Sequence, residues 1–150
     1  MPNWCEGWVK FRGSRENVIK FIRNEFDGAN PYDYDDFISP EIPTEKPIRI
    51  KSLVRAIVET EDLELANYDV WTKSGYALLV IKINHAWNVS RQGYAELAKK
   101  YDIDIKGKCY ENGMLFTEEF EYNSNGEEVF YKVLEYDDYI WECECPTLGG

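Results

Sequence analysis

The chain opens with a stretch of two-residue periodicity that gives way to helical periodicity. Polar and apolar side chains alternate over residues 3–13, which predicts a β-strand that ends at Gly13. Residues 15–26 then place apolar side chains three and four positions apart, as one buried face of an α-helix requires. Ser14 is suited to the N-cap of this helix, and Gly28 is suited to end it.

The middle of the chain is patterned less regularly. Residues 28–47 contain four prolines and an acidic, aromatic run with little periodicity, which indicates an insertion. Residues 48–60 fit either period, and their β-branched content favours extended structure. Residues 63–71 and 76–85 are typical of two strands, and Lys73–Gly75 predicts the hairpin turn between them.

The next segment, about 30 residues long, contains clear patterns for one strand and one helix. The continuous apolar run Tyr76–Ile81 predicts a central strand that is covered on both faces. Tyr94, Leu97 and Tyr101 then recur at helical spacing after Ser90. They predict a second helix with Ser90 as its N-cap.

From residue 103 onward the pattern is that of strands joined by short turns. The expected strands are 103–110, 114–122, 128–136 and 139–145. Asn125-Gly126 predicts a type I′ turn, which needs a positive φ at both central residues. The order of elements indicates an α+β fold, with both helices on one face of an antiparallel sheet and residues 103–145 as a C-terminal β-meander.

Composition places the chain among folded single domains. Its 150 residues are 44% hydrophobic and 15% aromatic, which suits one domain over residues 1–150 with one core. The longest apolar run is far shorter than the roughly 20 residues of a membrane-spanning helix. Residues 1–6 lack the features of a secretion signal. We therefore expect a cytoplasmic protein whose four cysteines are reduced.

Cysteine and histidine spacing gives little support to a metal centre. Cys143 and Cys145 would share one face of an extended segment, whereas Cys5 and Cys109 have no close partner in the sequence. A zinc site usually combines two such pairs, and the chain has one histidine, His85. We expect free core cysteines, a structural His85, and no metal or other cofactor.

Negative charge is concentrated near the C-terminus. The formal net charge is -11. Residues 111–150 contain eleven acidic residues and one basic residue, whereas residues 1–110 contain 17 acidic and 16 basic residues. A field of this sign repels phosphate backbones and attracts basic surfaces, so we expect a basic protein partner rather than direct nucleic-acid binding.

Four short motifs are distinctive: Pro2-Asn3-Trp4-Cys5, Asn67–Lys73, Ala86-Trp87 and Tyr110–Phe116. In their order over roughly residues 2–128, they resemble the Api92-like (YubB-type) ferredoxin-like domain family of phages and plasmids. The chain departs from the family pattern at Tyr68-Asp69 and Asn88-Val89. The resemblance implies a ferredoxin-like fold with extra strands and an origin in a mobile element. It implies no established activity.

The acidic meander suggests the most specific functional hypothesis, which is a surface that binds a protein partner. Rows of carboxylates interleaved with tyrosine and tryptophan can imitate the charge spacing of DNA. The expected partner-binding residues are Glu118, Glu119, Glu121, Tyr122, Glu127, Glu128, Tyr136, Asp137, Asp138, Tyr139, Trp141, Glu142 and Glu144. We expect a non-enzymatic accessory protein that binds a basic, nucleic-acid-handling host protein. An inhibitor of a host defence nuclease, such as a CRISPR effector, would fit. The alternative is an edge sheet whose acidic residues merely keep it soluble and unpaired.

Two other classes remain open. A small-molecule or metal-binding domain would use a Trp-rich region around Trp4, Cys5, Trp71 and Trp87, with His85 as a further candidate. A structural or oligomerising module is the second. Catalysis has weaker support, since acidic residues this frequent produce carboxylate pairs by chance, and no nucleophile motif accompanies the single histidine.

Overall fold

The computed structural model describes residues 2–27, 30–33, 38–41, 47–70 and 73–150. The helices are α1 (Arg15–Glu25), α2 (Arg91–Tyr101) and α3 (Tyr139–Glu142). The strands are β1 (Trp4–Ser14), β2 (Phe26–Asp27), β3 (Asn30–Asp33), β4 (Ile38–Glu41), β5 (Ile48–Ile50), β6 (Ala56–Val70), β7 (Lys73–Ala86), β8 (Asp104–Glu111), β9 (Phe116–Tyr122) and β10 (Glu128–Glu135).

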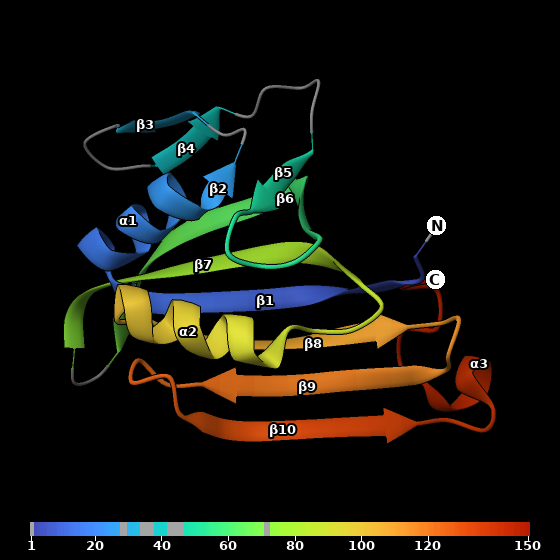
Figure 1. Cartoon of the computed structure of the whole chain (residues 1–150). Helices are drawn as coiled ribbons and strands as arrows, with labels where there is room; N and C mark the ends of the chain where they lie inside the picture. The colour runs from blue at the N-terminus through green and yellow to red at the C-terminus, as the bar shows by residue number, and fades with distance from the viewer. Residues whose placement is uncertain (1, 28–29, 34–37, 42–46, 71–72) are drawn as a thin grey trace.

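Eight of these strands form one sheet, and the two long helices lie against the same face of it (Figure 1). The strand order is β10-β9-β8-β1-β7-β6-β5-β2, and every neighbouring pair is antiparallel. Along β1, Cys5, Val9 and Phe11 are buried beneath the helices, whereas Trp8 and Lys10 are exposed on the opposite side, which we call the open face. The predicted α+β class with both helices on one face is confirmed.

Helix α1 begins as predicted but ends early. The Ser14 hydroxyl accepts a hydrogen bond from the Asn17 N–H at 3.1 Å. The helix stops at Glu25, because Phe26 turns into the extended strand β2 and buries its ring in the core. Gly28 lies outside the described residues, so the predicted glycine terminus is replaced by an earlier end.

The elements in the middle of the chain agree in part with those that the sequence pattern predicted. β6 and β7 form the predicted hairpin, with Val70 opposite Lys73, although Trp71 and Thr72 lie outside the described residues. In the predicted insertion, β3 and β4 pair into a separate two-stranded sheet. Residues 48–60 are extended only at β5 and from Ala56, because turns occupy residues 51–55.

Strand β7 is central but is not covered equally on both faces. Ala77, Leu79 and Ile81 are fully buried under the helices. Leu78 and Val80 are only half-buried on the open face. The apolar run therefore reflects one buried face and one partly exposed face, and the expectation of a doubly covered strand is wrong.

Helix α2 spans the predicted residues, with different capping chemistry. Ser90 occupies the N-cap position, but its side chain makes no capping hydrogen bond. The helix ends at Tyr101, and Asp102 adopts a left-handed φ of 52°. Tyr94, Leu97 and Tyr101 are buried against the sheet, as the spacing predicted.

The β9–β10 turn differs from the predicted type I′ geometry. Of its two central residues, only Gly126 has a positive φ, at 78°. The Gly126 N–H donates to the Asn123 carbonyl, while the Asn123 side chain accepts from the N–H groups of Asn125 and Glu127. A four-residue turn that ends in a single left-handed glycine is a common hairpin connection, and Asn123 supplies the bonds that fix it.

The fourth predicted strand, 139–145, is replaced by the short helix α3. The Asp138 carboxylate accepts from the Trp141 N–H and caps the helix. Tyr139 and Cys143, four positions apart, are buried together with Tyr110 in a small cluster. Since the Tyr110 side chain lies on the open face, the C-terminal segment covers one end of that face (Figure 1).

Candidate functional site

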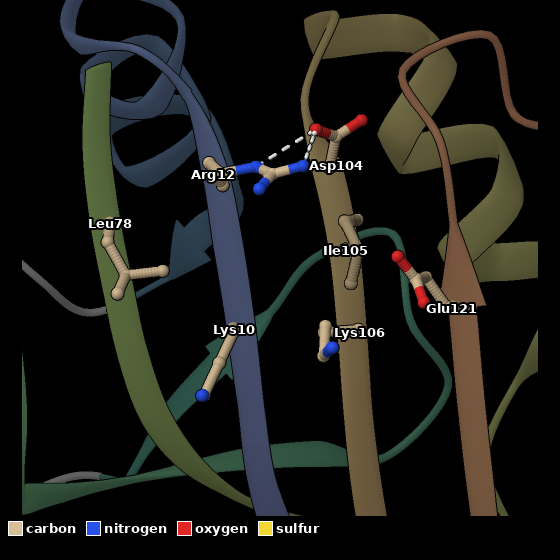
Figure 2. A pocket seen from close by; sticks show the side chains of 7 residues that line it. All are labelled: Lys10, Arg12, Leu78, Asp104, Ile105, Lys106 and Glu121. Carbon is tan, nitrogen blue, oxygen red and sulfur yellow. Dashed lines mark hydrogen bonds and ion pairs between the residues drawn. The ribbon is translucent and has the colours of Figure 1, made fainter. Parts of the chain in front are cut away.

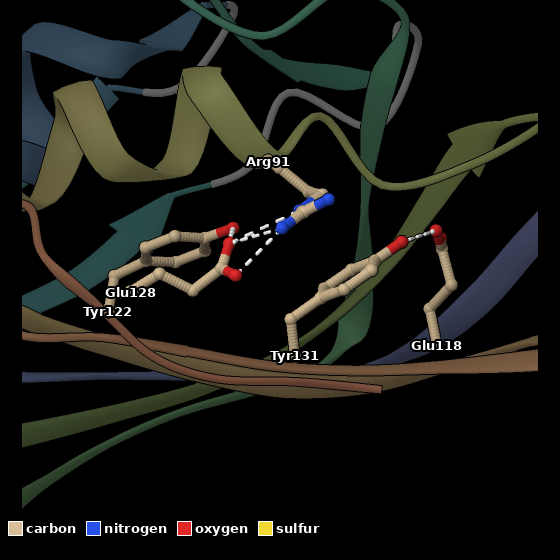
Figure 3. Close-up of polar contacts among 5 residues, drawn as sticks. All are labelled: Arg91, Glu118, Tyr122, Glu128 and Tyr131. Carbon is tan, nitrogen blue, oxygen red and sulfur yellow. Dashed lines mark hydrogen bonds and ion pairs between the residues drawn. The ribbon is translucent and has the colours of Figure 1, made fainter. Parts of the chain in front are cut away.

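Acidic residues that are close in sequence have different surroundings in the folded chain. Glu118 points into the core and is 4% exposed. Its carboxylate accepts from the Val89 N–H at 2.8 Å and from the Tyr131 hydroxyl at 2.7 Å (Figure 3). Glu118 is therefore unavailable to a partner, and its predicted contact role is wrong.

Three other predicted site residues are neutralised by cations from earlier elements. Arg91 on α2 holds Glu128 at 2.7 Å and lowers the pKa of its carboxyl (Figure 3). Lys108 on β8 pairs with Glu119 at 3.2 Å and also with Glu144. The hydrogen bond from Lys108 lowers the pKa of Glu144.

The Lys108–Glu119 pair belongs to a row of residues that crosses the open face. The row crosses six neighbouring strands in the order β10, β9, β8, β1, β7 and β6. Its residues, in the same order, are Lys132, Glu119, Lys108, Trp8, Lys82 and Glu59. Neighbouring charged residues in the row have opposite charges, and the uncharged Trp8 separates Lys108 from Lys82. The meander's open face thus carries alternating charges, which corrects the expectation of rows of carboxylates on it.

The remaining predicted residues divide between the two ends of β10. Glu127 lies at the β9–β10 turn, where it accepts from the Asn123 amide at 2.8 Å. Glu121 is half-buried opposite Lys106. A second group, residues 135–142, lies at the far end of β10, and we call it the α3 knob. The eight residues of β10 separate the two ends by roughly 25 Å, so the predicted acidic residues do not form one patch.

The α3 knob combines exposed acidic and apolar side chains. Ile140 and Trp141 are 77% and 86% exposed. Four carboxylates lie within six residues of them in sequence and form no ion pair with any residue in the described part of the chain: Glu135, Asp137, Asp138 and Glu142. The sequence did not indicate Ile140 as a partner-binding residue. The predicted strand would have placed its side chain on the face opposite to that of Trp141.

Predicted tyrosine anchors are mostly inside the protein. Tyr139 is buried, and its ring meets Tyr136 edge-on at 5.3 Å between ring centres. Tyr122 is buried against the core and donates its hydroxyl proton to Glu128. Both side chains fix the knob and the sheet, and Trp141 remains as the predicted aromatic anchor that a partner can reach.

A polar cluster lies in the core beneath α2. His85 bonds through Nε2 to the Tyr94 hydroxyl at 2.5 Å, and its Nδ1 lies 3.5 Å from the Cys109 thiol. Burial raises the pKa of Cys109, but the hydrogen bond from Cys5 and the charge of His85 outweigh it and lower that pKa to about 6. All four side chains are buried, so the cluster joins β1, β7, β8 and α2 and offers no site to a substrate.

Among the residues that the structure describes, the predicted Trp-rich region does not converge on a pocket. Trp4 and Cys5 point to opposite faces of β1, because side chains alternate along a strand. Trp87 is exposed with the Arg55 guanidinium 5.2 Å from its ring centre, and Trp71 lies outside the described residues. Within the described ranges, no three histidine, cysteine or acidic side chains are arranged to hold a metal ion.

Comparisons with known proteins add no relatives. No protein-family model matches the chain, and neither a curated protein nor a solved structure matches it. No helix in the described part of the chain is long and apolar enough to cross a membrane. The geometry and charge of the protein's surfaces are therefore the basis for proposing its function.

Proposed function

We propose that this protein is a non-enzymatic docking module that binds a basic protein through its α3 knob. One observation carries the proposal: Trp141 and Ile140 project from the fold among four carboxylates that have no cation partner in the described residues. Tryptophan is the side chain most enriched at energetic centres of protein interfaces. Clustered negative charge would steer a basic partner toward it.

The knob is preorganised, which lowers the entropic cost of binding. Tyr139 and Cys143 fasten its inner side to Tyr110. Asp138 accepts from the Trp141 N–H at 3.3 Å, and Glu142 accepts from the Asp138 N–H at 3.3 Å. The exposed rings and carboxylates are thus held on a bonded turn of helix rather than on a free terminus.

We further propose that the inner part of the sheet has a ferredoxin-like arrangement. The order β8-β1-β7-β6, with α1 after β1 and α2 after β7, supports this proposal because it matches a split βαβ pattern. An origin in a phage or plasmid, and a host defence nuclease as the partner, remain proposals that follow from the sequence resemblance. The acidic knob is compatible with such a nucleic-acid-handling partner.

Capture experiments with matched variants test the docking function. We expect Trp141→Ala to weaken binding of a captured basic protein about tenfold or more, because it removes the central aromatic anchor. Asp137→Asn combined with Glu142→Gln should slow association and reduce its dependence on salt. Surface plasmon resonance at low and high ionic strength measures both effects.

The control is Trp87→Ala, which removes another exposed tryptophan far from the knob in sequence. Capture that depends on salt, is lost in Trp141→Ala and persists in Trp87→Ala would support the proposal. Equal binding by the wild type and by both knob variants would refute it.

A further inference from the structure

A groove runs along the open face, and its lining includes Tyr110, which packs against Tyr139 of the α3 knob. Its larger cavity has a volume of about 470 Å³ and is lined by Trp8, Lys10, Lys106, Lys108, Glu121 and Phe130, among others. A second cavity of about 200 Å³ shares Lys10, Lys106 and Glu121 with it (Figure 2). The larger volume is within the range of small-ligand sites.

The cations of the groove differ in how they are paired. Lys108 contacts Glu119 and Glu144, and Lys82 on the same face contacts Glu6 and Glu59. Lys10 and Lys106, by contrast, have no ion pair with any residue in the described part of the chain, although they lie directly opposite each other on β1 and β8. Like charges at directly opposed positions are destabilising. An anion bound between these two lysines would remove that repulsion.

Aromatic surface flanks this pair of lysines. Trp8 precedes Lys10 by two residues on β1, so both side chains lie on the open face about 7 Å apart. Trp8 is 41% exposed, and Phe130, which also lines the groove, is 43% exposed. A flat π-surface beside an unpaired cationic pair favours a ligand that carries both a planar ring and a negative charge.

We propose that this groove binds a nucleotide unit, with its phosphate between Lys10 and Lys106 and its base stacked on Trp8. The unit is either a free nucleotide or part of a single strand, since both present the same phosphate and base. The net charge of -11 opposes binding, so the affinity is weak and depends on local contacts. Trp8, Lys10 and Lys106, which would hold the nucleotide, are not part of the α3 knob or of the protein-binding surface proposed for it.

Titration of the purified full-length chain tests the site. The probes are a mononucleotide, a ten-nucleotide single strand, inorganic phosphate and polyglutamate, followed by fluorescence anisotropy and by tryptophan emission. Two phosphate contacts predict that log K falls with log salt at a slope of about -1.4 for the single strand. Either nucleotide probe binding more tightly than phosphate and polyglutamate supports the proposal, and the tighter of the two identifies the source.

Variants separate this site from non-specific attraction. Lys10→Gln with Lys106→Gln should lower affinity about tenfold or more, and Trp8→Ala about fivefold or more, whereas Trp8→Phe should retain most of it. Glu121→Gln should tighten binding, because a carboxylate beside the phosphate is removed. Lys99→Gln, on the exposed side of α2, should leave affinity unchanged.

Circular dichroism and thermal melting of each variant confirm that loss of binding is not loss of folding. The proposal is overturned if phosphate or polyglutamate binds as tightly as both nucleotide probes. It is equally overturned if Lys99→Gln weakens binding as much as the double lysine variant, or if Glu121→Gln weakens it.

Discussion

Glu118 and Glu142 belong to the same acidic third of the sequence, yet their surroundings are opposite. Glu118 is buried beneath α2 and accepts hydrogen bonds from Val89 and Tyr131. Glu142 lies on the surface of the α3 knob and accepts one long bond from the Asp138 N–H. The first carboxylate holds the fold together, and the second contributes to a field that a partner can sense.

The contrast shows why charge counted along a sequence is a poor guide to the electrostatic surface. Residues 111–150 contain eleven acidic residues, but Glu111 and Glu118 are buried, and Glu119, Glu128 and Glu144 are paired with cations from β8 and α2. These cations precede the acidic region in sequence and join it only through folding. Negative charge free of cation partners is therefore concentrated at the α3 knob within the described residues.

The sharpest test of this contrast removes the buried carboxylate. We expect Glu118→Ala to lower the free energy of unfolding by about 3 kcal/mol, because the Val89 N–H and the Tyr131 hydroxyl would lose their buried acceptor. Urea unfolding followed by circular dichroism measures the change. Glu121→Gln, three residues along and half-buried on the open face, is the matched control and should change stability by less than about 0.5 kcal/mol. Equal effects of the two variants would contradict the contrast.

A second buried carboxylate gives a smaller effect that depends on pH. Glu25 accepts from the Tyr101 hydroxyl at 2.7 Å and from the Ser52 N–H at 3.0 Å, with the Lys100 ammonium at 3.4 Å. Burial raises the pKa of Glu25, but these partners outweigh it and hold that pKa below its usual value of 4.5. Because the pKa is lower in the folded state, the stabilisation is complete above the unfolded pKa and is lost as the pH falls through the folded pKa.

Glu25→Gln should therefore cost about 1–2 kcal/mol at pH 7 and progressively less below pH 4.5. Urea unfolding of the wild type and of Glu25→Gln, measured from neutral to acidic pH, gives one curve of unfolding free energy against pH for each protein. Parallel curves, with the same difference at every pH, would show that the charge of Glu25 is not the source of the stabilisation.

Local patterning predicted most of the fold. The alternation that leads to Gly13, the Ser14 cap and the helical spacing around Tyr94 are properties of contiguous residues, so they can be found without tertiary contacts. The segment that begins at Tyr139 was misjudged, because a helix of four residues is too short to display its period. The cap from Asp138 determines its conformation instead.

The candidate site was less predictable, because its properties depend on pairing between distant strands. Trp141 was predicted as an anchor from the Asp and Glu residues around it in sequence, and its side chain is exposed, while the anchor role itself stays a prediction. That Lys108 would neutralise Glu119 and Glu144 depends on the register of β8 and β9 and on the return of the C-terminal segment. No local pattern encodes these two features.

The smallest expected effect on stability concerns the exposed carboxylates of the α3 knob. Glu135 and Asp137 form no ion pair with a described residue, so Glu135→Gln with Asp137→Asn should change the free energy of unfolding by less than about 0.5 kcal/mol. Any change should be a gain at low salt, because two mutually repelling charges are removed, and the gain should vanish at high salt. Urea unfolding at two ionic strengths measures this. A loss of stability comparable to that of Glu118→Ala would mean that these carboxylates support the fold, and the distinction between a buried structural set and an exposed partner-binding set would fail.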